Sequence, residues 1–123
     1  MGEIVSLRTA QLKASRQDVA DPAVQERFQA LRERRMTWGM GLRHRRQTQG
    51  LTTRSLADTI GLSTPTLISA VEAGRGRIPP GVLAGWALAI GMEPAEFAAG
   101  YLAAFEPEAY AALRAPATER EQA

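Results

Sequence analysis

Apolar residues recur at helical spacing along most of the chain, and the clearest repeats lie near its middle. Two short stripes there have members three and four residues apart: Leu56, Ala57 and Ile60, and then Leu67, Ile68 and Val71. This spacing places each set on one face of an α-helix. Because helices this short are not stable alone, both need neighbours on their apolar side. The pattern therefore predicts two short helices docked on a small helical core.

Residues with turn and capping chemistry separate the two stripes. Gly61 suits a left-handed residue at the end of the first helix. Thr64 can cap the second helix, and Pro65 fits its first position, where no backbone N–H is needed. Thr52 can cap the first helix in the same way. Together these residues predict two helices joined by a tight turn.

The second helix has a side of small and polar residues that its apolar stripe leaves free: Thr66, Ser69 and Ala73. A helix docked on a small core with such a face outward is what DNA reading requires. The charge distribution agrees, because residues 22–78 carry ten arginines and four acidic residues, whereas residues 79–123 carry two arginines and six acidic residues. A basic segment beside an acidic one favours a polyanion partner for one face.

The N-terminal part of the chain predicts a further helix, which starts with Asp21 as a cap and Pro22 at the first position. Apolar residues then follow at spacings of four, three, seven and four: Val24, Phe28, Leu31, Trp38 and Leu42. Arg35 and Arg45 stand where the same stripe would place apolar residues. Either one helix runs from Pro22 toward Gln49, or two helices break near residues 37–39.

Glycines favour the break, since Gly39 and Gly41 each cost about 1 kcal/mol in a helix interior. Further along, residues 75–80 have the composition of a loop, and a helix is expected from Pro80 to Gly91. Its predicted buried face consists of Leu83, Trp86, Ala87 and Ile90. Another helix is expected from Pro94 and a short one over residues 106–114. Residues 1–20 and the end of the segment 106–123 are expected to be mobile tails.

The composition excludes several functions. The chain of 123 residues has no cysteine and one histidine, His44, so neither a disulfide framework nor a zinc site is expected. No serine or threonine has a base positioned to activate it, and residues 75–77 lack a phosphate-loop fingerprint. We therefore expect no enzyme, cofactor or metal. No apolar run is long enough to span a membrane. The absence of cysteine fits the reducing environment of the cytoplasm, which is the expected location. Fourteen arginines to one lysine is typical of a GC-rich bacterium.

An ordered set of short motifs carries a resemblance to a known family. They are GLT at 50–52, LA at 56–57, IG at 60–61, VEAG at 71–74 and ALAIG at 87–91. The stretch from about residue 42 to 97 resembles the Xre, or lambda-repressor-like, helix-turn-helix family, with one extra residue between Gly61 and Glu72. The resemblance implies an all-α fold with a compact five-helix domain at 38–105, an extra N-terminal helix at 21–37 and a C-terminal helical extension.

The resemblance also implies a function and site residues. The protein would be a sequence-specific, double-stranded DNA-binding transcription regulator, with a recognition helix at about 64–73 in the major groove of a palindromic or pseudopalindromic site. Whether it represses or activates stays open. The residues it assigns to bases are Thr64, Pro65, Thr66 and Ser69. Those assigned to phosphates are Thr52, Thr53, Arg54, Arg75 and Arg77. Arg46 and Glu72 would form a structural ion pair.

The partners implied are double-stranded DNA and a second copy in a homodimer, with RNA polymerase or a second regulatory protein as a further class. Surplus apolar surface is expected to join the copies, from the stripe at 24–31 and from Phe97, Tyr101, Leu102 and Phe105. An alternative function stays open: an antitoxin-like or adaptor protein that mainly binds a protein partner through its terminal helices.

Overall fold

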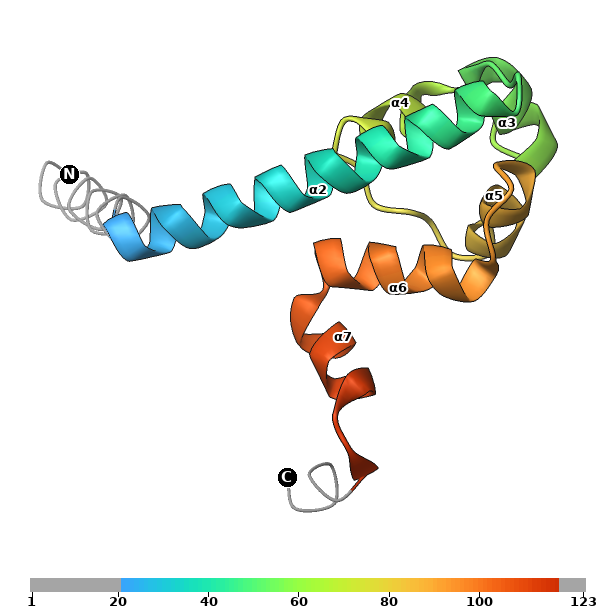
Figure 1. The fold of residues 1–123 in the computed structure, drawn as a ribbon. Coiled ribbons are helices and arrows are strands. Elements are labelled where there is room, and N and C mark those ends of the chain that lie inside the picture. The colour runs from blue at the N-terminus through green and yellow to red at the C-terminus, as the bar shows by residue number, and fades with distance from the viewer. Residues whose placement is uncertain (1–20, 118–123) are drawn as a thin grey trace, which may run out of the picture. The chain divides into compact units, whose positions relative to one another are not determined.

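The computed structural model describes residues 21–117, and all regular structure within that range is helical (Figure 1). The helices are α2 (Pro22–Thr48), α3 (Thr53–Ile60), α4 (Thr66–Glu72), α5 (Leu83–Ala89), α6 (Pro94–Phe105) and α7 (Pro107–Arg114). None of them is both long and apolar enough to cross a bilayer. The all-α prediction is confirmed. The predicted tail at 1–20 lies outside the described residues, as does the predicted tail at 117–123 apart from its first residue.

Helix α2 is continuous, so the expected break near residues 37–39 is wrong. Its start is as predicted, because the Asp21 carboxylate accepts a hydrogen bond from the Ala23 N–H at 2.9 Å. Gly39 is buried inside the helix, and a Cβ there would lie 2.4 Å from the carbonyl oxygen of Glu72. The glycine thus permits a close backbone contact, which offsets its helix-propensity cost of about 1 kcal/mol.

The chain separates into two compact units between Arg32 and Glu33. The described part of the first unit is residues 21–32, which belong to α2 apart from the cap. The second unit contains the rest of α2 and all the other helices in residues 33–117.

Local signals determine the ends of α3. The Thr52 hydroxyl accepts from the Ser55 N–H at 3.0 Å, and the Ser55 hydroxyl accepts from the Thr52 N–H at 2.8 Å. This reciprocal capping box satisfies two backbone donors that have no partner within the helix. Gly61 ends the helix in the left-handed conformation, with φ 83°. Both the cap and the glycine terminus are as predicted from the sequence.

Helix α4 starts at Thr66, two residues after the predicted cap. The Thr64 hydroxyl nevertheless accepts from the Thr66 N–H at 3.0 Å, and the Pro65 carbonyl accepts the first helical bond from Ser69 at 3.1 Å. Pro65 already has helical backbone angles. Pro65 rather than Thr64 is therefore the N-cap, so the predicted cap and first helical position each lie one residue too early, although the Thr64 hydroxyl does bind the first N–H of the helix.

Helix α5 starts at Leu83, later than the predicted Pro80. Gly81 has φ 89°, a left-handed conformation that a continuing helix cannot include. The predicted buried face is largely correct, because Trp86, Ala87 and Ile90 are buried. Helix α6 begins at Pro94 as predicted.

The core of residues 33–117 is formed by buried side chains from α2 to α6: Leu42, Leu56, Ala57, Ile68, Val71, Trp86, Ala87, Ile90, Met92 and Phe97. Trp38 packs against this core beside three rings of α6, with ring centroids 5.5 Å from Phe97, 5.7 Å from Tyr101 and 6.0 Å from Phe105. The α6 residues expected to join two copies are therefore largely used within one chain, since Phe97 and Phe105 are buried.

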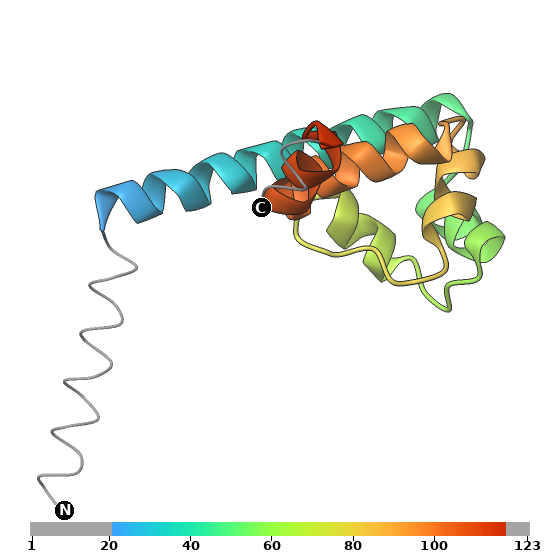
Figure 2. The same ribbon diagram turned by 90° about the horizontal axis from the view of Figure 1, so that it is seen from below.

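Helix α6 runs antiparallel to residues 34–45 of α2 (Figure 2). Arg35 donates to the Ala104 carbonyl at 3.1 Å and its guanidinium lies over the Phe105 ring, 4.8 Å from the centroid. Arg34 reaches the Ala103 carbonyl at 3.3 Å. Cations that bind the last carbonyls of a helix also oppose its dipole. Arg35 thus occupies a stripe position because it binds the end of α6.

Candidate functional site

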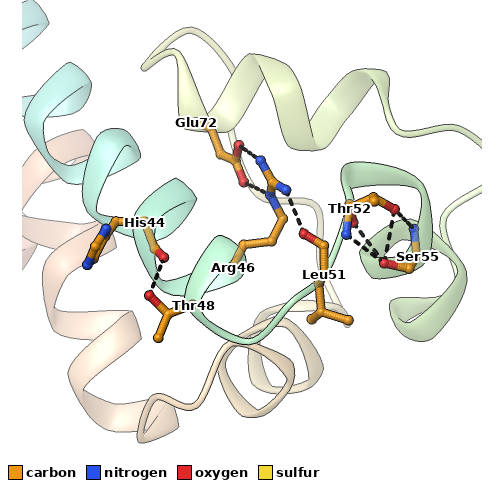
Figure 3. Close-up of polar contacts among 7 residues, drawn as sticks. All are labelled: His44, Arg46, Thr48, Leu51, Thr52, Ser55 and Glu72. Carbon is orange, nitrogen blue, oxygen red and sulfur yellow. Dashed lines mark hydrogen bonds and ion pairs between the residues drawn. The ribbon is translucent and has the colours of Figure 1, made fainter.

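A buried ion pair joins α2 to the end of α4. The Arg46 guanidinium donates to both carboxylate oxygens of Glu72, from Nε at 2.7 Å and from Nη2 at 3.0 Å (Figure 3). Its remaining Nη1 donates to the Leu51 carbonyl at 2.7 Å. The side chains are only 8% and 6% exposed. The structure thus brings together the two residues expected to pair, and ties them to the segment that leads into α3.

Backbone contacts fix the position of this pair. A Cβ on Gly39 would strike the Glu72 carbonyl, and a Cβ on Gly74 would lie 2.7 Å from the Met36 N atom. Gly74 also has φ 79°, a conformation that favours glycine. These two glycines let α2 approach the C-terminal end of α4 backbone to backbone. The orientation of α4 is therefore determined by close packing as well as by the ion pair.

Helix α4 has a buried side and an exposed side. Ile68 and Val71 are fully buried, whereas Thr66, Ser69 and Ala73 are exposed. Thr64 in the preceding turn is exposed and Pro65 is half-buried. Three of the four residues expected to face bases therefore present hydroxyl groups to the outside.

A shallow hollow of about 370 Å³ lies between α2, α3 and α4. Its lining residues are Met40, Arg43, Arg46, Thr53, Ser69, Glu72 and Ala73. The buried ion pair forms part of this lining, together with two predicted site residues, Thr53 and Ser69. Arg43 is exposed at the same hollow and was not among the predicted site residues. Its position three residues before Arg46, on the same helix face, was the available signal.

The other residues expected at phosphates have different surroundings. The Thr52 hydroxyl is engaged in the capping box. Arg54 is exposed and lies 4.0 Å from Asp58, and Arg75 is exposed. These side chains were predicted as one group, but only Thr53 lines the hollow.

Arg77 is bound within the chain. Its guanidinium donates to the carboxylate of Glu106 at the start of α7 and lies 5.6 Å from the centroid of the Phe105 ring. The hydrogen bond that Arg77 donates to Glu106 raises the pKa of Arg77 above its ordinary value, and the carboxylate charge adds to that effect. About half of each side chain is exposed. The structure therefore places Arg77 on an acidic partner of its own chain.

Within residues 21–117, no three histidine, cysteine or acidic side chains gather in a way that suits a metal ion. Comparison of the chain with models of protein families, with curated proteins and with solved structures finds no match.

Proposed function

We propose that α3 and α4 form a helix-turn-helix unit, and that the protein is a sequence-specific, double-stranded DNA-binding transcription regulator. One observation carries the proposal: the exposed, small and polar side of α4 is held in place by a buried bidentate ion pair. A buried pair costs desolvation and is weak evidence for stability alone. Its value here is that it fixes the orientation of a short helix.

The exposed side of α4 suits the major groove, which admits an α-helix. Thr66 and Ser69 offer hydroxyls that bond base edges, and the threonine methyl can contact thymine. Ala73 adds no bulk near the end of the helix. Because none of these side chains can form a bidentate contact with a base, each would discriminate weakly between bases. Part of the specificity would then come from DNA shape.

The hollow beside α4 suits a phosphate of the DNA backbone. Arg43 supplies a positive charge and Thr53 a hydroxyl at its rim. The first N–H groups of α3 have no partner within the helix and carry the positive end of its dipole. Contacts of this kind position a protein on DNA without reading its sequence. Arg54 and Arg75, both exposed, extend the basic surface.

Two copies would occupy the two halves of a palindromic site, with their α4 helices 34–36 Å apart, which is one turn of DNA. The test is selection from a random double-stranded DNA library with the full chain. We expect an enriched motif with two related half-sites. Arg43→Ala should weaken binding to every selected sequence, whereas Arg114→Ala, which makes the same charge change in α7, should not. Failure to enrich any motif would overturn the proposal.

A second candidate function is an antitoxin-like or adaptor protein whose main role is to bind a protein partner. The observation that favours it is the apolar stripe in residues 21–32, where Phe28 is 48% exposed. Co-purification of the full chain with a partner that resists high salt would support this function. The two functions use different residues and can be tested separately.

A further inference from the structure

Residues 21–32 carry a narrow apolar stripe. Val24, Phe28 and Leu31 follow at spacings of four and three residues, so they lie on one side of α2. Phe28 is 48% exposed, and Val24 and Leu31 are half-buried. A stripe with alternating spacings of three and four residues is the seam that helices use in coiled-coil pairing.

Basic residues flank this stripe on both sides. At 3.6 residues per turn, Arg27 falls on one flank and Arg32 on the other, whereas Glu26 falls on the far side of the helix. Both arginines are exposed, and neither forms an ion pair with another residue of the described part. The flanks therefore carry one sign of charge, and the acidic residue lies away from the seam.

This charge pattern argues against a second copy as the occupant. In a coiled coil the flanking positions of one helix face those of the other and determine the choice of partner. If two copies paired along this stripe, in parallel or antiparallel orientation, Arg27 and Arg32 of one copy would face Arg27 or Arg32 of the other. Like charges at such positions are repulsive. An occupant with acidic residues on its flanks would pair favourably with both arginines.

We infer that the stripe at Val24, Phe28 and Leu31 is a docking surface for an acidic, amphipathic helix of another protein. The narrow seam fits a helix better than a bilayer, because helices that lie in membrane interfaces present a broad apolar face. The surface uses no residue of the proposed DNA site. The inference rests on the second candidate function, that of a protein-binding adaptor, and it is independent of the proposed DNA-binding function.

The test uses the full chain and two synthetic four-heptad peptides. Both have leucine at the a and d positions, and one has glutamate at e and g where the other has lysine. Fluorescence anisotropy of the labelled peptides should show binding of the acidic peptide at least ten times tighter than that of the basic peptide. The preference should weaken as salt is added, because exposed charge pairs are screened.

Variants identify the surface. Phe28→Asp should weaken binding of the acidic peptide at least tenfold, and Ala30→Asp, with the same new side chain on the other side of the helix, should change it less than twofold. The double variant Arg27→Glu with Arg32→Glu should reverse the preference toward the basic peptide. Circular dichroism should show wild-type helix content in each variant.

Three outcomes would overturn the inference. Equal binding of both peptides would show that charge does not select the partner. A dimer of the free chain that Phe28→Asp dissociates would show that a second copy occupies the stripe. Binding to vesicles of anionic phospholipid that Phe28→Asp abolishes, without binding of the acidic peptide, would assign the surface to a membrane.

Discussion

Gly39 lies so close to Glu72 that a Cβ on the glycine would be 2.4 Å from the glutamate carbonyl oxygen. This contact joins the middle of α2 to the end of α4. A glycine that weakens its own helix therefore strengthens the association of two helices.

Gly39→Ala should destabilise the protein by about 1–3 kcal/mol, because the gain in helix propensity is outweighed by a clash with backbone atoms that cannot move freely. Gly41→Ala is the matched control, since no atom lies within 4 Å of a Cβ at that position. It should stabilise by up to about 1 kcal/mol. Urea unfolding of both variants measures the difference. Equal effects of the two substitutions would contradict the close contact.

Glu72→Ala should cost about 3–5 kcal/mol of unfolding free energy, because it leaves the buried Arg46 guanidinium without its partner. Glu96→Ala removes the partner of Arg45 in an exposed ion pair, in which the Arg45 side chain is 44% exposed and the Glu96 side chain 58% exposed. That change should cost at most about 1 kcal/mol. Thermal and urea unfolding of both variants check the comparison. A similar small loss for both would show that the Arg46 pair is solvated.

Glu106→Ala should tighten binding to non-specific DNA, because it releases Arg77 for contact with phosphate. The slope of log affinity against log salt should steepen by about 0.9 for one added phosphate contact. Glu108→Ala removes the same charge from α7 without releasing Arg77 and should leave the slope unchanged. In the double variant Glu106→Ala with Arg77→Ala, the salt slope should return to the wild-type value. A slope that stays steeper would show that the change in net charge, and not the release of Arg77, causes the effect.

Thr66→Ala and Ser69→Ala should relax base preference at one or two positions of each half-site and leave the salt slope nearly intact. Arg43→Ala should weaken binding to all sequences alike and flatten that slope by about one unit. Thr59→Ala is a control for the loss of a hydroxyl, since Thr59 lies on α3 and bonds to the Ser55 carbonyl. Library selection and a salt series measure both quantities. Unchanged base preference in the α4 variants would remove α4 from the DNA interface.

Much of the fold follows from signals that lie within a few residues of each other. Thr52 and Gly61 define the two ends of α3 through their own backbone and side-chain chemistry, and the structure confirms both. Asp21 and Pro22 do the same for the start of α2. Local capping chemistry can be predicted because it depends on neighbours that the sequence displays directly.

Contacts between distant residues were harder to predict. Gly39 indicated a break in α2 because its helix cost is local, whereas its contact with Glu72 depends on the arrangement of two helices. Arg77 was expected at phosphate because the family resemblance assigns its loop to the DNA backbone, yet Glu106, which is distant in the sequence, pairs with it in the fold. The Arg46–Glu72 pair could be anticipated only because a family resemblance supplied the distant partner.

The two tryptophans of the chain, Trp38 and Trp86, both lie in the unit of residues 33–117. Trp86 is fully buried and Trp38 packs among the rings of α6. Intrinsic tryptophan fluorescence will therefore report the unfolding of this unit but not the unfolding of residues 21–32. A substitution that unfolds only the first turns of α2 would not change the tryptophan fluorescence. Every experiment on the stripe at Val24, Phe28 and Leu31 therefore needs circular dichroism as a measure of helix content.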